Sequence, residues 1–187
     1  MAATPASIGK VGFLADTHSM KADGSDLPDR VLRAFDGVDL IVHLGDIGRK
    51  AILDRLTEVA PVLVPFGGNK GYLRHATTDA PIKVIDAGAH CVGLTFNLAQ
   101  PDKKIAVSAT GIAFPDEPLA TLLKRRFRQP VTVVAFGGTH RGLEQDHEGV
   151  LLFNPGSPTL PDSGAKATVA VLDLTRAKPK VKLVPVG

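Results

Sequence analysis

Short apolar runs that end at polar residues mark the first third of the chain. Three of them predict buried strands, over residues 11–15, 40–42 and 62–64. Apolar residues at helical spacing lie between these runs and predict helices over residues 26–37 and 50–59. We expect Asp26 to be the N-cap of the first helix, with Pro28 in its first turn. The alternation of strand and helix predicts a parallel sheet built from βαβ units.

The pattern changes in the rest of the chain, where the apolar runs are shorter and closer together. They predict strands over residues 82–85, 91–96, 105–107 and 131–136, with one helix over residues 117–128. Three later runs predict antiparallel strands of a second sheet, over residues 150–153, 168–174 and 181–184. The whole pattern favours an α/β fold with two sheets. The 187 residues fit a single domain, 1–187, and we expect residues 1–8 to be flexible.

Composition narrows the class of protein. Hydrophobic residues make up 44% of the chain and charged residues 22%, which is typical of a globular protein. A single cysteine, Cys91, excludes an internal disulfide and favours a reducing compartment. The first ten residues lack the apolar segment of a secretory signal, and no apolar run has membrane-spanning length. We therefore expect a cytoplasmic protein that does not bind a membrane.

The positive charge is small, with a net value of +3. Its densest run, Lys124 to Arg126 with Arg128, is typical of the solvated face of a helix. The chain has no tryptophan and one tyrosine, so it lacks a stacking platform for single strands. These features argue against nucleic acid as a partner.

Candidate metal ligands follow four of the predicted strands. They are, in chain order, Asp16 and His18, then Asp46, then Asn69 and Lys70, then His140. Because the carboxyl ends of parallel strands meet at one edge of a sheet, we expect these side chains to converge. Two carboxylates with two imidazoles suit Mn²⁺, Fe²⁺ or Zn²⁺ better than Ca²⁺, which prefers oxygen ligands throughout.

The order of these motifs resembles a known family. The motifs are Asp16-Thr17-His18, Gly45-Asp46, Gly68-Asn69, Gly137-Gly138-Thr139-His140 and Asn154-Pro155-Gly156-Ser157. Together they resemble the calcineurin-like metallophosphoesterases over residues 11–174. The most similar group is the small bacterial and archaeal phosphodiesterases, which share their fold with the phosphoesterase-like subunit of retromer. The resemblance implies an αββα sandwich of mixed parallel and antiparallel strands.

The resemblance also implies a site for two metal ions. Asp16, His18 and His140 would hold the first ion, Asp46 would bridge both, and Asn69 would bind the second. A bridging hydroxide would then attack phosphorus in line.

The chain departs from the family pattern around the second ion. Gly138 stands where the family has the first histidine of a Gly-His-Thr-His motif. The histidine of the family's His-Gly pair aligns best with Thr110, before Gly111, and the alternative alignment places Phe96-Asn97 there. We therefore expect one strongly held divalent ion, Mn²⁺ first with Zn²⁺, Fe²⁺ or Ni²⁺ as alternatives, and a second ion that is weak or absent.

Lys70 follows Asn69 where the family usually has histidine or aspartate. Our hypothesis is that its ammonium replaces part of the second ion's charge and holds a phosphate, so that Asp46, Asn69 and Lys70 form the catalytic set. The alternative is a solvated loop lysine. Arg141 and Thr110 are further candidates for substrate binding, although a surface position is an equal alternative for Arg141.

The other histidines are weaker candidates. His43 precedes the second ligand loop and either orients a ligand or is a buried, satisfied side chain. We expect His75, His90 and His147 at the surface.

Two functions are compatible with these motifs. The first is a metal-dependent phosphoesterase, a hydrolase acting on a phosphodiester or phosphomonoester of a small phosphorylated substrate. The alternative is a weakly active or inactive scaffold that binds a protein partner, with an exposed apolar patch at the metal edge or on a sheet face, above all over residues 80–108. The sequence leaves the formation of a homo-oligomer open.

Overall fold

The first of two five-stranded sheets holds both ends of the described chain. The computed structural model describes residues 8–65, 84–99 and 105–187. The strand order of this sheet is β12-β11-β1-β2-β3. The strands are β1 (Lys10–Leu14), β2 (Leu40–His43), β3 (Val62–Leu63), β11 (Thr168–Asp173) and β12 (Lys180–Pro185). β1, β2 and β3 are parallel, as predicted, whereas β11 and β12 run antiparallel to their neighbours.

The second sheet has the order β4-β5-β8-β10-β9. Its strands are β4 (Val84–Ala87), β5 (His90–Thr95), β8 (Val133–Phe136), β9 (Gly142–His147) and β10 (Val150–Pro155). β5, β8 and β10 are parallel, and the edge strands β4 and β9 are antiparallel. A small hairpin of β6 (Ala106–Val107) and β7 (Ile112–Ala113) stands apart from both sheets.

The prediction that the last two strands belong to the second sheet is wrong. β11 pairs with β1, with Gly12 opposite Val171, and so joins the first sheet. The chain changes sheets between β10 and β11. Apolar alternation shows which face of a strand is buried but not which strand lies beside it, so the pattern could not reveal this change.

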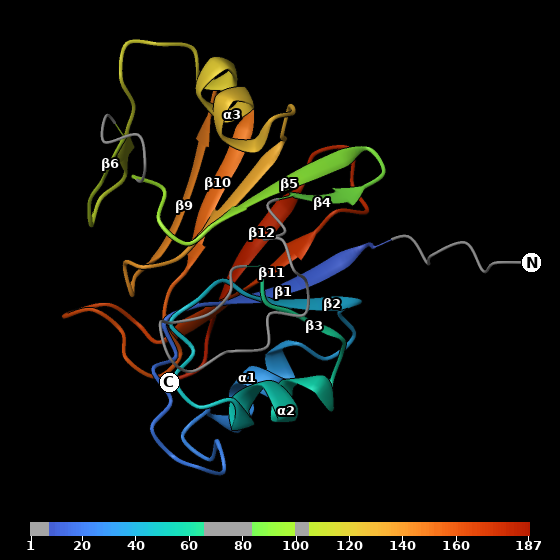
Figure 1. The fold of residues 1–187 in the computed structure, drawn as a ribbon, viewed down its shortest axis with the longest axis vertical. Helices are drawn as coiled ribbons and strands as arrows, with labels where there is room; N and C mark the ends of the chain where they lie inside the picture. Colours follow the sequence, from blue (N-terminus) through green and yellow to red (C-terminus); the bar gives the residue numbers. More distant parts are fainter. Residues whose placement is uncertain (1–7, 66–83, 100–104) are drawn as a thin grey trace, which may run out of the picture.

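Helices cover the outer faces of both sheets (Figure 1). α1 (Asp29–Ala34) and α2 (Ala51–Thr57) lie on the first sheet, and α3 (Leu119–Phe127) lies on the second. This arrangement confirms the αββα sandwich. No helix of the described residues is both long and apolar enough to cross a membrane.

The predicted N-cap of α1 is wrong. Pro28 occupies the cap position, and no side chain caps the helix. Asp26 instead accepts hydrogen bonds from the Ser19 hydroxyl (2.7 Å) and from the backbone N–H groups of Met20 (2.6 Å) and Lys21 (3.1 Å). Asp26 therefore shapes the loop that leaves β1 and not the helix.

The core between the sheets contains aliphatic and aromatic side chains from both. Phe13 of β1 and Phe153 of β10 are fully buried and pack edge to face, with ring centroids 5.0 Å apart. Burial of such a side chain contributes roughly 1.5–3 kcal/mol. This contact joins the two sheets close to the strand ends where the predicted ligands lie.

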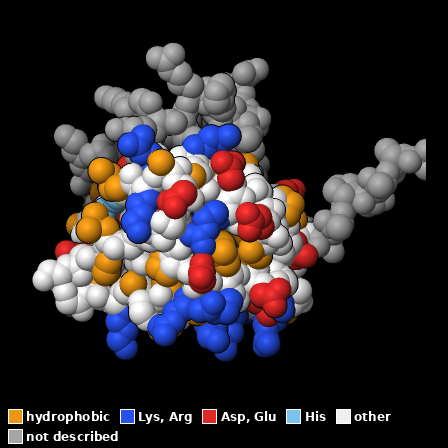
Figure 2. Space-filling model, turned by 90° about the horizontal axis from the view of Figure 1, so that it is seen from below, with side chains coloured by type: hydrophobic (Ala, Val, Ile, Leu, Met, Phe, Trp, Pro, Cys, Tyr) orange, Lys and Arg blue, Asp and Glu red, His pale blue; other side chains and the backbone are white. Residues whose placement is uncertain are grey.

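The face over α1 and α2 carries both signs of charge (Figure 2). Arg55 and Asp29 form an ion pair at 2.6 Å, and Lys50 and Asp54 a longer one at 3.8 Å.

Candidate metal centre

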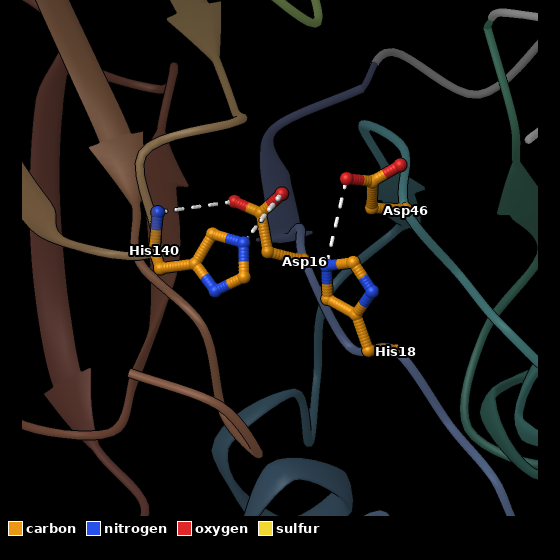
Figure 3. A group of neighbouring side chains, drawn as sticks. All are labelled: Asp16, His18, Asp46 and His140. Carbon is orange, nitrogen blue, oxygen red and sulfur yellow. Dashed lines mark hydrogen bonds and ion pairs between the residues drawn. The ribbon is translucent and has the colours of Figure 1, made fainter. Parts of the chain in front are cut away.

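Four of the predicted metal ligands lie together at the carboxyl ends of the strands. Asp16 and His18 follow β1, Asp46 follows β2 and His140 follows β8. Each of them offers a ligand atom within 4.8 Å of the others, and the Asp16 carboxylate faces His140 while the Asp46 carboxylate faces His18 (Figure 3). Asn69 and Lys70 lie outside the described residues, so their predicted roles stay predictions.

The backbone of these four residues is strained. Their φ angles are 53° at Asp16, 42° at His18, 53° at Asp46 and 56° at His140. Within the described ranges, six residues other than glycine have a positive φ, and these four are among them. Left-handed backbone costs free energy and collects at functional sites, where the surrounding structure holds it in place.

Backbone hydrogen bonds hold the loops after β1 and β2 side by side. Asp16 N–H donates to the carbonyl of Gly45 (3.0 Å), and His18 N–H donates to the carbonyl of Asp46 (2.9 Å). Gly48, with φ of +79°, allows a close approach, because a Cβ there would lie 2.3 Å from the carbonyl oxygen of Ser19. The loops therefore hold His18 and Asp46 in a fixed relation.

Asp16 is the buried member of the cluster, with a side chain that is 0% exposed. Its carboxylate accepts hydrogen bonds from the N–H groups of Gly138 (2.9 and 3.2 Å) and His140 (3.4 Å). Burial raises the pKa of this carboxyl, and His140 and the two N–H groups partly oppose that rise. A cation beside Asp16 would, like these N–H groups, favour the ionised form of the carboxyl.

Both imidazoles offer a nitrogen to the cluster. His140 Nδ1 lies 2.7 Å from the carbonyl oxygen of Leu160 and donates to it, which leaves Nε2 as an acceptor 3.9 Å from Asp16. His18 Nε2 is buried, lies 3.5 Å from Asp46, and has no hydrogen-bond partner among the described residues. The two rings stack with centroids 5.0 Å apart. A buried, unpaired nitrogen facing a carboxylate fits a divalent cation.

The Asn154-Pro155-Gly156-Ser157 motif forms hydrogen bonds to the loops that carry the ligands. The Ser157 hydroxyl donates to the carbonyl of Asp16 (2.7 Å) and accepts from Leu160 N–H (2.8 Å). Asn154 Nδ2 donates to the Thr139 hydroxyl (3.0 Å), beside His140. This motif therefore connects the loop after β1 to the loop after β8.

His43 is a buried link between two ligand loops. Gly45 N–H donates to its Nδ1 (3.3 Å), so Nε2 carries the proton and donates to the Thr17 hydroxyl (2.9 Å). That hydroxyl in turn donates to the carbonyl of Ile47 (2.7 Å). Burial, and then the nearby charge of His18, lower the pKa of His43 to about 3. His43 is thus a satisfied, neutral side chain that positions the two loops.

The structure favours Phe96, and not Thr110, as the residue that replaces the family's second-ion histidine. β5 lies beside β8 in parallel, and Gly137 N–H donates to the carbonyl of Phe96 (3.0 Å), so Phe96 reaches the same edge as His140. Thr110 lies in the exposed turn of the β6–β7 hairpin, 3.3 Å from the Ser108 hydroxyl. The preference for Thr110 is corrected: spacing along the chain could not show which strand ends at the site.

Phe96 packs against three glycines that flank the ligands. A Cβ at Gly45 would lie 2.5 Å from its ring, and a Cβ at Gly137 or Gly138 would lie 3.3 or 3.4 Å from it. The ring is half-buried. This contact was not predicted, and its only signal in the sequence is the glycine beside each ligand motif.

Arg141 lies next to His140 but is already paired. Its guanidinium donates to the Asp162 carboxylate (2.9 Å) and to the carbonyl of Ser163 (2.8 Å), and it lowers the pKa of Asp162. Arg141 also lines a cavity of about 200 Å³ with Ser108 and other residues. Substrate binding by Arg141 and Thr110 stays a prediction.

The expectation that His90 is exposed is wrong. His90 begins β5, is buried, and its Nε2 lies 2.8 Å from the carbonyl oxygen of Arg176. This hydrogen bond joins the β4–β5 hairpin to the turn after β11. His147 is half-exposed and stacks on Phe114, with centroids 4.4 Å apart. His75 lies outside the described residues.

Comparison with known proteins agrees with the motifs. Residues 10–177 match the calcineurin-like phosphoesterase superfamily domain, and the chain belongs to this superfamily. It is 33% identical over 176 residues to a probable metallophosphoesterase of Methanocaldococcus jannaschii, covering 94% of this chain and 81% of the relative. A probable metallophosphoesterase of Methanothermobacter thermautotrophicus is 29% identical over 152 residues, 81% of this chain and 78% of the relative.

A solved structure shows the same fold. Vps29 from Chaetomium thermophilum superposes with a TM-score of 0.63 at 16% identity, over 94% of this chain and 97% of that chain. At this identity the likeness concerns the fold alone.

Proposed function

We propose that the chain is a divalent-metal-dependent phosphoesterase that hydrolyses a phosphodiester or phosphomonoester of a small phosphorylated substrate. The observation that carries this proposal is the cluster of Asp16, His18, Asp46 and His140, whose ligand atoms lie within 4.8 Å. The superfamily match supports the same reaction class.

The cluster is suited to this chemistry. A divalent ion held there would polarise a phosphoryl oxygen and lower the pKa of bound water. Asp16 is anchored by backbone N–H groups, and His140 is held by the carbonyl of Leu160. His18 and Asp46 have side chains that are 37% and 28% exposed, so substrate approaches from their side.

We propose one strongly held ion. We align Gly138 and Phe96 with the family's two second-ion histidines, and neither residue brings a side-chain donor. Mn²⁺ is our first choice, and Zn²⁺, Fe²⁺ or Ni²⁺ suit the same mixed N/O ligands. After saturation with Mn²⁺ and gel filtration, we expect one ion per chain by elemental analysis. Two tightly bound ions per chain would contradict this part of the proposal.

The decisive experiment uses Mn²⁺ and a generic aryl phosphodiester. Wild-type protein should release the aryl alcohol, and Asp46→Asn should reduce kcat at least about 100-fold, because a carboxylate of the ion site is lost. Asp36→Asn, at an exposed position, is the matched control and should keep wild-type activity. Binding of Mn²⁺ without turnover of monoesters or diesters would favour the scaffold alternative.

The scaffold alternative expects an apolar patch at the metal edge or on a sheet face, above all over residues 80–108. The described part of that stretch exposes no large hydrophobic side chain.

A further inference from the structure

Large hydrophobic side chains are exposed at only two positions of the described chain. Met20 is 77% exposed and Leu160 is 53% exposed. Both lie beside the metal centre. Met20 follows His18 by two residues, and the carbonyl of Leu160 accepts the hydrogen bond of His140 Nδ1. Among the described residues, the large exposed apolar side chains are therefore found on the two loops next to His18 and His140.

The loops that carry these two side chains are joined. The Thr159 hydroxyl donates to the carbonyl of Thr17 at 2.5 Å, which brings the loop of Leu160 against the loop of Met20. Both loops are held rigidly. Asp26 fixes the backbone at Met20, and the Ser157 hydroxyl accepts from Leu160 N–H. Their exposed side chains are therefore presented from ordered backbone.

Phe96 adds an aromatic ring on another side of the cluster. The glycine before Asp46 and the glycines before Thr139 leave space for this ring, and a side chain at Gly45 would collide with it. The ring is half-buried, so part of it remains accessible. Phe96, Met20 and Leu160 thus lie on the loops that carry or hold the four polar ligands.

We propose that Phe96, Met20 and Leu160 form an apolar wall that binds the aromatic ester group of the substrate while its phosphoryl group lies at the metal centre. This inference rests on the proposed phosphoesterase function and names its substrate class as aryl phosphoesters. An aromatic group gains edge-to-face contact with Phe96 and a sulfur contact with Met20, beyond the burial of apolar area.

The size of the wall favours a small molecule over a protein. A stable protein interface buries on the order of 800 Å² on each partner, which is far more than three side chains provide. The wall also adjoins the cluster that would anchor the phosphoryl group, so one small molecule can contact both.

The test compares ligands that share a phosphoryl group and differ in the ester group. Inorganic phosphate, methyl phosphate and phenyl phosphate are titrated into Mn²⁺-loaded protein by isothermal titration calorimetry, before any turnover is measured. We expect phenyl phosphate to bind about tenfold more tightly than methyl phosphate, because the ring buries apolar surface against the wall.

Variants assign the preference to the wall. Phe96→Ala should remove most of the preference for phenyl phosphate, and the double variant Met20→Ser with Leu160→Ser should reduce it at least about threefold. The double variant should leave the affinity for Mn²⁺ and for methyl phosphate unchanged. Phe114→Ala removes a half-buried ring on the β6–β7 hairpin side and should keep the full preference. The double variant decides the question if Phe96→Ala does not fold.

Two failures are distinguishable. Equal affinities for methyl and phenyl phosphate, or a preference that survives in both wall variants, would overturn the wall and leave the phosphoesterase function standing. If none of the three phosphates binds Mn²⁺-loaded protein, the proposed function is itself overturned, and the inference with it.

Discussion

Two ligand side chains of the candidate centre, His140 and Asp16, are oriented by groups that are not ligands, and the loops of the other two are held by a buried histidine. The carbonyl of Leu160 holds His140, the N–H of Gly138 holds Asp16, and His43 holds the loops of His18 and Asp46. Such partners set the direction and tautomer of ligands, and their loss typically weakens metal binding 10–100-fold. Substitutions of these supporting residues therefore test the site directly.

The Ser157 hydroxyl is one such partner. In Ser157→Ala the carbonyl of Asp16 loses its donor, and we expect a loss of about 1–2 kcal/mol in the free energy of unfolding, measured by urea denaturation. Mn²⁺ affinity, measured by calorimetry, should fall about tenfold. Ser163→Ala, at an exposed position, is the control. Unchanged Mn²⁺ affinity in Ser157→Ala would show that the hydroxyl does not position Asp16.

The lowered pKa of His43 should make the free energy of unfolding depend on pH. Its pKa is about 3 in the folded protein and 6.5 when unperturbed, so below pH 6.5 the unfolded chain takes up a proton that the folded protein does not. Stability from this residue is complete above pH 6.5 and is lost as the pH falls, by about 1.5 kcal/mol between pH 6.5 and pH 5.

The variant His43→Gln isolates this effect. Because glutamine does not titrate, the metal-free variant should lose about 1.5 kcal/mol less than wild type between pH 6.5 and pH 5 in urea denaturation. The raised pKa of Asp16 acts in the opposite sense but is shared by both proteins. Parallel pH profiles for the two proteins would contradict a neutral, buried His43.

At the scale of elements, the turn after β10 decides how the second sheet supports the first. Gly156 has φ of +78°, and a Cβ there would lie 2.3 Å from the Thr168 hydroxyl of β11. This close approach lets the chain leave β10 and cross to the other sheet beside Ser157.

Gly156→Ala should therefore destabilise the protein by about 2–4 kcal/mol, since it adds a collision to an unfavourable φ. Gly164→Ala is the matched control. Gly164 has φ of +75° but open space around its Cβ position, so we expect only the backbone cost of about 1 kcal/mol. Equal losses of unfolding free energy in the two variants would mean that the close contact with Thr168 is unimportant.

The same scale shows what the sequence could and could not predict. The parallel strands of the first sheet were predictable, because apolar runs ended by Asp16 and Asp46 have few other interpretations. The sheet membership of β11 was not, since a pattern of buried positions carries no information on partners. The choice between Thr110 and Phe96 failed for a related reason, because it depended on which strand lies beside β8.

At the scale of the whole molecule, the candidate centre joins the two sheets. Asp16 and Asp46 extend from strands of the first sheet, and His140 extends from the second. An ion bound by all three would favour the packed arrangement over the unfolded chain.

Mn²⁺ at about 100 times its dissociation constant should stabilise the wild-type protein by about 2.7 kcal/mol. The thermal midpoint should rise with Mn²⁺ concentration and return to its starting value with excess chelator. His140→Ala should abolish most of this rise, and His147→Ala, a half-exposed position on β9, should keep it. A rise that persists in His140→Ala would place the bound ion elsewhere.

The one-sided burial of the cluster has a kinetic consequence. Among the four described ligands, Asp16 is fully buried, whereas His18, Asp46 and His140 are partly open to solvent. A bound cation and a phosphate product would therefore leave the site on the same side. Bound phosphate should therefore slow the release of the cation. We expect a chelator to remove Mn²⁺ faster from protein dialysed free of phosphate than from protein in phosphate buffer.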